Sequence, residues 1–471
     1  MNRNDIIISA ENIAEQREYS IKCREIMSQK FGRTPKACVV TFGCQQNEAD
    51  SELIRSMLAD MGFEFSPKPE NADLVIFNTC AIREHAEMRA FGNMGQSSHV
   101  KNANNSAIIC VCGCMAQQAH VEQRVKKSFP YVDILFGTHA LWRFPSLLYK
   151  KLTVGKRVFD TSGEGVIIEG VEPLRKEPPN AWLSIMYGCN NFCSYCIVPY
   201  VRGRERSRDP EVILSEFKKL VDAGYKDITL LGQNVNSYGN DLDNGIDFSE
   251  LLRRINDIPG DFRVRFMTSH PKDATKKLFD TMAECDKVCK AIHLPVQCGS
   301  DRVLDMMNRR YTSKHYLELI DYARSKMPEL TITSDIIVGF PGENEQDFQD
   351  TLDLVEKVRY DSLFTFIYSR RQGTKAAVMP DPETAEDKQR SFDKLLEVQN
   401  RISREKNELY MDRVCKVLID GHSEDNSYTY KGRTEGFKLV HINGRPGLVG
   451  TWQNVKINRT STWALFGEVV E

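Results

Sequence analysis

No stretch of this 471-residue sequence is apolar for long enough to cross a bilayer. Its longest apolar runs are short, and Ala107–Cys114 is typical of them. Residues Met1–Asp5 lead into mixed polar sequence, without the apolar segment that a secretory signal requires. These absences argue against a membrane-spanning helix, and they predict a cytoplasmic protein with no membrane partner.

The sequence also has no excess of positive charge. Its 63 Lys and Arg residues are balanced by 65 Asp and Glu residues, which gives a formal net charge of −2. A strong overall basic field is therefore absent, although a local basic face is sufficient to bind RNA. Hydrophobic residues make up 41% of the chain and charged residues 27%, as in ordinary globular proteins, and the length predicts roughly three domains.

Cysteine, in contrast, is plentiful, with 14 residues. In a reducing cytoplasm we expect them to be metal ligands or catalytic thiols rather than disulfides. Cys189, Cys193 and Cys196 form a Cys-x3-Cys-x2-Cys run, and we call them the motif cysteines. A cubane iron–sulfur cluster takes one thiolate for each iron. Three thiolates leave the fourth iron open to a reactant, so the run predicts catalytic chemistry.

Two other interpretations of this run stay open. A structural zinc site has four closed ligands, usually in Cys-x2-Cys pairs, and the run offers one such pair with no His nearby. Three unrelated structural cysteines are the other possibility. The spacing favours an iron–sulfur cluster over both.

Residues 35–150 alternate strand-like and helical patterns behind an N-terminal extension, residues 1–34, and predict a parallel α/β domain. The expected strands are Ala37–Gly43, Asp73–Asn78, Ser106–Val111 and Val132–Gly137. Cys44, Cys80 and Cys114, the strand-end cysteines, lie just beyond the first three. Because the carboxyl ends of parallel strands share one edge, we expect these thiols to converge as a second ligand set. The alternative is that they are small buried hydrophobic residues.

A Pro-rich, charged linker at residues 151–178 precedes a longer repeating region, residues 179–405. Its expected strands are Ala181–Tyr187, Asp227–Leu231, Phe262–Thr268, Lys290–Leu294, Thr331–Val338 and Asp361–Tyr368. Six parallel βα units predict a partial TIM-like barrel with functional groups at the carboxyl ends of its strands. The motif cysteines follow the first strand directly.

Residues 406–471 change to short strands separated by Gly and Asn turns, which predicts a small β-barrel. The expected strands are Val414–Ile419, Tyr428–Lys431, Lys438–Ile442, Leu448–Ile457 and Leu465–Val470. Aromatic and basic side chains mix here as on RNA-binding surfaces, and the candidate contacts are Tyr430, Lys431, Arg433 and Lys438. An ordinary small barrel with amphipathic strands is the alternative. The predicted fold class is therefore a multidomain α/β protein that ends in a small β-barrel.

The motif cysteines, placed after the first strand of a βα barrel, resemble those of the radical SAM superfamily. The expected order of domains is a three-cysteine α/β domain, this barrel and a terminal barrel of the TRAM type. From about residue 35 onward, this order resembles that of the methylthiotransferases. The strings that match the MiaB-type, tRNA-modifying branch are Gly188–Cys196, Ile197–Arg208, Leu231–Gly239, His293–Gln297, Asp335–Glu343 and Gly432–Gly436. Cys298, Arg370 and Gln372 depart from the family pattern, but none is at a ligand position.

The resemblance implies that the motif cysteines hold a 4Fe-4S cluster whose open iron binds S-adenosylmethionine (SAM). The strand-end cysteines hold a second 4Fe-4S cluster that supplies sulfur. One electron splits SAM, and the resulting 5′-deoxyadenosyl radical abstracts hydrogen from C2 of an adenine. The implied product is a 2-methylthio group on dimethylallyl-adenosine at position 37 of tRNA, with its methyl group from a second SAM. The implied partners are the anticodon stem-loop and an external one-electron reductase such as flavodoxin, with the enzyme as a monomer.

The resemblance also suggests contacts to SAM and to RNA. The SAM candidates lie near strand ends of the barrel: Gly232, Gln233, Asn234, Gln297, Asp335 and Gly339. Structural support of those strand ends is the alternative. Arg202, Arg204 and Arg206 follow the motif cysteines, and we expect them to meet tRNA phosphate or the SAM carboxylate unless they form a solvated charge run.

Other functions stay open at this point. A methylthiotransferase of this kind can act on threonylcarbamoyl-adenosine in tRNA or on a ribosomal-protein aspartate, although the string around Gln233–Tyr238 argues against the protein-directed branch. A non-catalytic iron–sulfur RNA-binding protein and a zinc-stabilised α/β protein are further alternatives. Two separate three-cysteine sets at strand ends argue against a simple binding module.

Overall fold

The computed structural model describes residues 6–81 and 84–470, and for residues 84–86 it describes the backbone alone. Its contacts divide the chain into two compact units. Unit 1 contains the chain up to Arg175 together with Met186–Asn190 and Cys196–Arg206. Unit 2 contains Lys176–Ile185, Asn191–Tyr195 and the chain from Ser207 onward. In the part of the chain that the structure describes, no helix is long and apolar enough to span a membrane.

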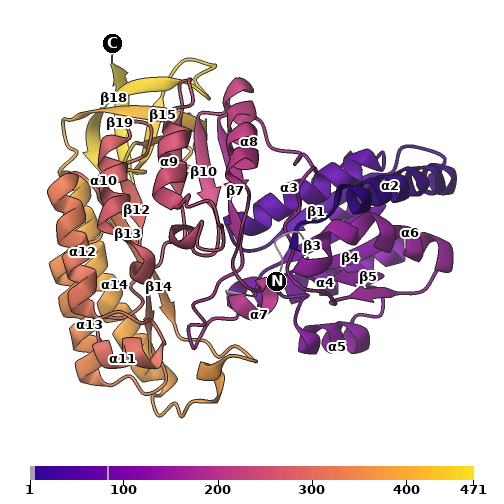
Figure 1. The fold of residues 1–471 in the computed structure, drawn as a ribbon, viewed down its shortest axis with the longest axis horizontal. Helices are drawn as coiled ribbons and strands as arrows, with labels where there is room; N and C mark the ends of the chain where they lie inside the picture. Colours follow the sequence, from indigo (N-terminus) through magenta and orange to yellow (C-terminus); the bar gives the residue numbers. More distant parts are fainter. Residues whose placement is uncertain (1–5, 82–83, 471) are drawn as a thin grey trace. The chain divides into compact units, whose positions relative to one another are not determined.

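Unit 1 is built on a six-stranded parallel sheet in the order β2-β1-β3-β4-β5-β6 (Figure 1). The strands are β1 (Lys36–Thr41), β2 (Glu64–Phe65), β3 (Leu74–Thr79), β4 (Ile108–Gly113), β5 (Ile134–Phe136) and β6 (Val158–Asp160). This confirms the predicted parallel domain. Strand β6 lies inside the segment predicted as a linker, because Val158 pairs with Ile134 at the sheet edge.

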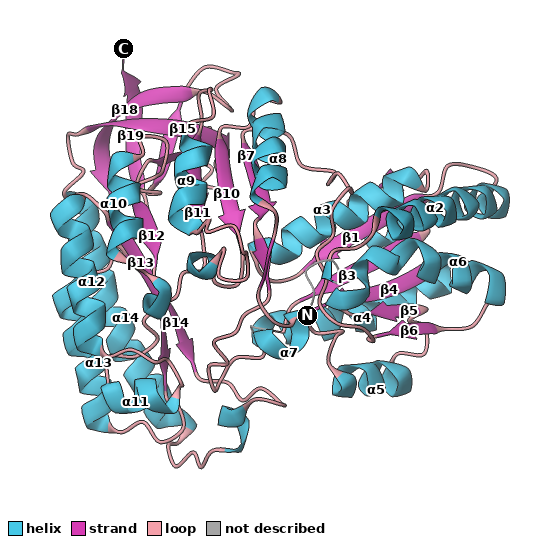
Figure 2. Cartoon of the chain, viewed as in Figure 1, coloured by secondary structure: helices cyan, strands magenta, loops and turns pink. Residues whose placement is uncertain are grey.

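Helices cover both faces of this sheet (Figure 2). They are α2 (Ala10–Phe31), α3 (Gln45–Asp60), α4 (Glu84–Ala103), α5 (Ala119–Ser128) and α6 (Phe144–Val154). Strand alternation explains the two cores: Leu74 and Ile76 of β3 pack with α2, α3 and α6, whereas Val75 and Phe77 pack with α4 and α5. Helix α2 lies in the predicted N-terminal extension and buries Met27 in the first core.

Unit 2 contains six parallel strands in two groups of three. One sheet has the order β11-β10-β7 and the other β12-β13-β14, and a bridge between Val264 and Val288 joins β11 to the segment before β12. The strands are β7 (Asn180–Ser184), β10 (Asp227–Leu231), β11 (Arg263–Phe266), β12 (Ala291–His293), β13 (Thr331–Val338) and β14 (Ser362–Ile367). This arrangement agrees with the predicted partial barrel of six βα units.

The connecting helices of unit 2 follow their strands in sequence. They are α8 (Pro210–Asp222), α9 (Phe248–Asn256), α10 (Lys276–Glu284), α11 (Asp301–Met306), α12 (Ser313–Lys326), α13 (Glu345–Val358) and α14 (Ala385–Glu408). Helix α8 begins as its sequence predicts: the Asp209 side chain accepts hydrogen bonds from two backbone N–H groups, and Pro210 occupies the first turn.

The C-terminal part of unit 2 is a closed barrel of five strands in the order β15-β16-β17-β19-β18. The strands are β15 (Val414–His422), β16 (Tyr430–Thr434), β17 (Leu439–Asn443), β18 (Trp452–Thr460) and β19 (Leu465–Val470). Its core includes Val417, Val440, Val455 and Tyr430. The predicted small barrel is therefore confirmed, and it has no open sheet edge.

Candidate functional sites at two sets of cysteines

The strand-end cysteines lie at the carboxyl edge of the unit 1 sheet, next to its central strands. Cys44 follows β1 and precedes α3, Cys80 directly follows β3, and Cys114 directly follows β4. Strands β1, β3 and β4 are parallel neighbours in register, so their carboxyl ends lie side by side. Topology therefore gathers residues that are far apart in the sequence.

Contacts with Asn47 and Gly43 show that these three cysteines converge. Asn47 Oδ1 lies 3.8 Å from Cys44 Sγ and 3.9 Å from Cys114 Sγ. Gly43 has φ +116°, and a Cβ at this position would lie 2.8 Å from Cys80 Sγ. The close approach of Cys80 to the β1–α3 turn is possible because residue 43 is glycine.

Arg202, at the end of the short helix α7 (Val198–Arg202), belongs to the same site. Its Nε donates to Cys114 Sγ at 3.1 Å, and its Nη2 donates to Asn47 Oδ1 at 3.0 Å and Asp50 Oδ2 at 2.7 Å. The arginine is buried, with 6% of its surface exposed. We predicted it as an RNA contact, and that prediction is wrong because its guanidinium is held inside unit 1.

The three thiols at this edge provide the donor set that an iron–sulfur cluster requires. A cubane binds each thiolate at a different iron, which keeps the sulfur ligands apart. Burial raises the pKa of the Cys114 thiol to about 12, while the charge of Arg202 acts to lower it. A buried thiol of this kind becomes a thiolate when a metal takes the place of its proton.

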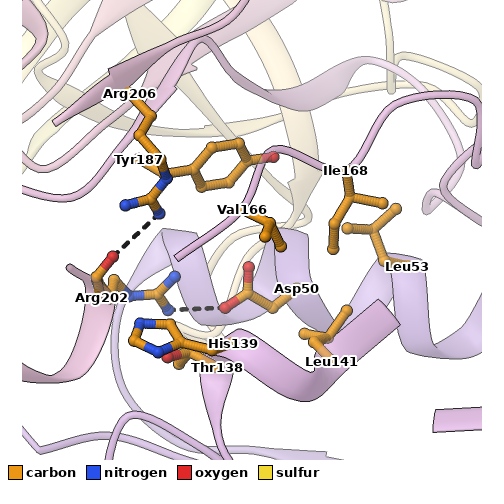
Figure 3. A pocket seen from close by; sticks show the side chains of 10 residues that line it. All are labelled: Asp50, Leu53, Thr138, His139, Leu141, Val166, Ile168, Tyr187, Arg202 and Arg206. Atoms are coloured by element: carbon orange, nitrogen blue, oxygen red, sulfur yellow. Dashed lines mark hydrogen bonds and ion pairs between the residues drawn. The ribbon is translucent and has the colours of Figure 1, made fainter. Parts of the chain in front are cut away.

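A pocket in unit 1 is lined in part by Arg202, the residue that contacts Cys114 (Figure 3). The pocket is partly open, and its space of about 430 Å³ includes open solvent. Its lining residues are Asp50, Leu53, Thr138, His139, Leu141, Val166, Ile168, Tyr187, Arg202 and Arg206. One guanidinium therefore lies between the pocket and the thiol. Arg206 is buried beside it and donates to the Arg202 carbonyl at 3.0 Å.

The motif cysteines lie on the loop that follows β7 and β8 (Met186–Tyr187). Cys189 and Cys193 are buried, and Cys196 is half-buried. Within unit 1, the Cys189 backbone N–H donates to Gly203 O at 3.1 Å. Within unit 2, the Asn308 side chain donates to Asn191 O and Phe192 O, at 3.1 and 2.9 Å, which holds the backbone before Cys193.

Arg309 gives Cys193 the kind of partner that Arg202 gives Cys114. Its Nη1 donates to Cys193 Sγ at 3.4 Å, its Nη2 to Pro295 O at 2.6 Å, and its Nε to Tyr311 Oη at 2.9 Å. Arg309 is buried, and our sequence analysis missed it. The basic pair Arg309-Arg310 was visible in the sequence, but nothing there indicated which arginine points inward.

The predicted SAM contacts lie at or near the carboxyl ends of the unit 2 strands. Gly232, Gln233 and Asn234 follow β10, Gln297 follows β12, Asp335 lies in β13, and Gly339 directly follows β13. Gln297 has φ +74° and pairs in parallel with Ile336, so this turn stays close to β13. All six residues lie on or after strands of unit 2, and their role in binding SAM stays a prediction.

Buried polar atoms without partners mark the same strand ends. Among the described residues, Asn234 Oδ1, Ser269 Oγ and His270 Nε2 are buried without a hydrogen bond. Asn234 Nδ2 is held by Asp273 Oδ2 at 2.7 Å, and His270 Nδ1 accepts from Lys272 N at 3.1 Å. Burial and the charge of Arg309 lower the pKa of His270, so its ring is neutral. Ser269 and His270 follow β11, and the sequence analysis did not select them.

Several predicted RNA contacts prove to be structural. Tyr430 is 3% exposed in the core of the small barrel, and Lys438 is 9% exposed and paired with Asp361 at 2.9 Å. Together with the buried Arg206, they are not available as RNA contacts, and these predictions are wrong. The sequence pattern could not separate inward from outward positions on such short strands.

Three predicted RNA contacts keep some exposure. Arg204 is exposed, Lys431 pairs with the exposed Glu424 at 2.5 Å, and Arg433 lies over the Phe437 ring at 4.6 Å. Their contact with RNA stays a prediction. The surviving basic positions are few, which is consistent with the chain's small net charge.

Comparisons with known proteins agree with this geometry. Residues 183–355 match the Radical SAM superfamily model, and residues 36–137 match that of "Uncharacterized protein family UPF0004". Among solved structures, the radical S-adenosylmethionine methyltransferase TsrM from Kitasatospora setae aligns with a TM-score of 0.52 at 13% identity. That alignment covers 73% of this chain and 75% of TsrM, and it supports the fold alone. Fold and cysteine placement together define a radical SAM protein.

Curated relatives narrow this class to one family. The tRNA-2-methylthio-N(6)-dimethylallyladenosine synthase of Clostridioides difficile (strain 630) is 50% identical over 473 residues, which covers 99% of each chain. The protein of that name from Acetivibrio thermocellus is 48% identical over 99% of this chain and 98% of its own. The chain therefore belongs to the tRNA-2-methylthio-N(6)-dimethylallyladenosine synthase family of radical SAM methylthiotransferases.

Proposed function

We propose that this chain adds a 2-methylthio group to C2 of N(6)-dimethylallyladenosine at position 37 of tRNA. In this proposal the motif cysteines hold the 4Fe-4S cluster that binds SAM, and the strand-end cysteines hold a second 4Fe-4S cluster. When bound, the clusters and SAM supply one-electron bond cleavage and the sulfur and methyl groups of the product.

The observation that carries the two-cluster assignment is the convergence of the strand-end cysteines. Asn47 touches two of the thiols, and Gly43 allows the third to approach. Radical generation alone requires one such set, so a second, largely buried set with its own arginine supports a second cofactor. The donor chemistry fits a cluster with one open iron, because three thiols serve four irons.

The chain's own residues would then bind, orient and exclude water. Arg202 and Arg309 each direct an N–H group at a cysteine sulfur, which stabilises the thiolate form by a charge-assisted hydrogen bond. Asn234, Ser269 and His270 offer buried polar atoms that hydrogen-bond the polar groups of SAM, and a neutral His270 serves as donor or acceptor. Burial of these groups keeps water from the reacting atoms.

The partners follow from the same chemistry. We propose that an external one-electron reductase of the flavodoxin kind supplies the electrons. We also propose that the enzyme works as a monomer in the cytoplasm, on the anticodon stem-loop. Arg204, Lys431 and Arg433 are the proposed contacts to RNA phosphate or bases, since they retain exposure and positive charge.

The experiment compares substrates in one assay. Cluster-reconstituted full-length protein is incubated under anaerobic conditions with SAM, a chemical reductant and one of two tRNAs, with or without the dimethylallyl group. Mass analysis of the digested nucleosides should show the methylthio product from the dimethylallyl tRNA alone. A threonylcarbamoyl-adenosine tRNA and a ribosomal-protein peptide are run in parallel, and a methylthio product on either of these instead would overturn the proposed substrate.

A further inference from the structure

The Arg202 guanidinium makes three polar contacts within the strand-end site. It donates to Cys114 Sγ, to Asn47 Oδ1 and to Asp50 Oδ2, at 3.1, 3.0 and 2.7 Å. Each of these partners is itself buried. The planar guanidinium is thus fixed in one orientation, in which Nε points at a sulfur and Nη2 at a carboxylate.

Asn47 extends the reach of this arginine to Cys44. Its Oδ1 accepts from Arg202 and lies 3.8 Å from Cys44 Sγ. Its Nδ2 donates to Phe42 O at 2.9 Å and to Thr79 O at 3.0 Å, so the amide cannot turn. One guanidinium therefore contacts Cys114 directly and Cys44 through a rigid amide.

Helix α7 presents Arg202 to the site in a fixed position. Ile197 and Val201 pack with Ala81 and Cys114 in one buried apolar cluster. The Thr138 hydroxyl donates to the Val201 carbonyl. The helix is therefore anchored on the residues that neighbour Cys80 and Cys114, and the arginine at its end has little freedom to leave.

Charge gives this geometry a consequence for the cofactor. Three thiolates give a cubane net negative charge, and each added electron increases it. A cation held against one thiolate in a buried site stabilises the reduced form more than the oxidised form, because screening there is weak. Asp50 opposes this effect and at the same time holds the cation in place.

We propose that Arg202 is a positioning residue for the cluster of the strand-end cysteines. It orients Cys114 and holds the Asn47 amide beside Cys44, and its charge raises the reduction potential of that cluster. The inference rests on the proposed two-cluster function. It means that Arg202, which follows the motif cysteines in the sequence, acts at the strand-end cysteines.

The test isolates the strand-end cluster before changing the arginine. The background is the full-length chain with Cys189→Ala, Cys193→Ala and Cys196→Ala, reconstituted with iron and sulfide. Into it are introduced Arg202→Met, Arg202→Lys, Asp50→Asn and, as the matched control, Arg204→Met, an exposed arginine two residues away. The readouts are iron content, the midpoint potential followed by electron paramagnetic resonance, and the rate of iron loss to a chelator.

We expect Arg202→Met to lower the midpoint potential and to speed iron loss about tenfold or more, as for other residues that support metal ligands. Arg202→Lys should restore part of the potential, and Asp50→Asn should raise it. The double variant Arg202→Met with Asp50→Asn removes both charges and should fall between the single variants. It also keeps the test open if Arg202→Met alone leaves Asp50 unpaired and unfolds unit 1.

Two results are distinguishable failures. If the background protein binds no cluster, the two-cluster function fails, and the inference fails with it. If the background protein binds a cluster whose potential and iron loss are the same in the Arg202→Met and Arg204→Met variants, the inference alone is overturned.

Discussion

The two cysteine sets are assembled in opposite ways. The motif cysteines are neighbours in sequence, and a single loop after β7 and β8 carries them. The strand-end cysteines come from three separate strand ends, and a glycine and an asparagine bring them together. In each set, a buried arginine donates to a cysteine sulfur, Arg202 to Cys114 and Arg309 to Cys193. The common feature of the two sets is therefore this arginine, whereas the backbone that supplies the thiols differs.

The largest expected effect comes from removing the glycine of the strand-end set. Gly43→Ala places a Cβ close to Cys80 in a backbone of φ +116°, so it should destabilise unit 1 by about 3 kcal/mol or more and prevent assembly of its cluster. Thermal unfolding and iron content measure both effects. Gly32→Ala is the control, since Gly32 has φ +61° with no atom within 4 Å of the added Cβ, and it should cost about 1–2 kcal/mol without iron loss. Equal iron loss in both variants would mean that Gly43 is needed only for its backbone conformation and not for the close approach of Cys80.

A smaller effect should separate the two arginines. Arg309→Met should reduce cleavage of SAM to 5′-deoxyadenosine about 10- to 100-fold, because Cys193 loses its charged donor. The potential of the strand-end cluster should stay the same, which electron paramagnetic resonance can follow. Arg310→Met changes the exposed neighbour and serves as the control. If Arg309→Met shifted the strand-end cluster instead, the assignment of one arginine to each set would be wrong.

The smallest expected effect concerns pH and belongs to unit 2. Burial raises the pKa of Glu343 to about 7, although the Gly339 N–H group donates to its carboxylate at 2.5 Å. The folded state therefore retains a proton that the unfolded chain releases near pH 4.5. This contribution to stability is present below about pH 4.5 and is lost as pH rises to about 7.

Glu343→Gln should remove this slope, because the amide keeps an oxygen acceptor for Gly339 and does not titrate in this range. Calorimetric unfolding of the wild-type and variant chains between pH 5 and 8 measures the difference. Parallel slopes in the two proteins would show that Glu343 is charged throughout. The comparison also tests whether the pH response lies in unit 2, where Glu343 packs against Cys298.

Much of the fold could be predicted from the sequence, because strand and helix periods alternate clearly in both units. The strand-end cysteines were also predictable, since parallel topology brings strand ends to one edge. Arg202 and Arg309 were not, because a run of arginines gives no indication of which side chain points inward. Tyr430 and Lys438 were misassigned for a related reason. Short barrel strands expose every second residue, and a shift of one residue in register decides which side chains face solvent.

The segment after the motif cysteines also shows that sequence alone does not reveal which arginines are buried. Its four arginines look alike in sequence, yet Arg202 contacts Cys114, whereas Arg208 pairs with Glu216 in unit 2 at 2.8 Å. Only packing separates them, since α7 is anchored by Ile197 and Val201. Charge runs near a motif are therefore poor evidence for RNA binding until their burial is known.

The central claim is that the two cysteine sets hold separate clusters with separate roles. The most direct measurement is iron content, 5′-deoxyadenosine and methylthio product in the Cys44→Ala, Cys80→Ala, Cys114→Ala triple variant. Its control replaces the buried, non-ligand Cys38, Cys110 and Cys112 of the same sheet with Ala. We predict that iron falls from about eight to about four per chain, that SAM cleavage persists, and that no methylthio product forms, while the control keeps its iron. Loss of all iron, or retention of the methylthio product, would contradict the account.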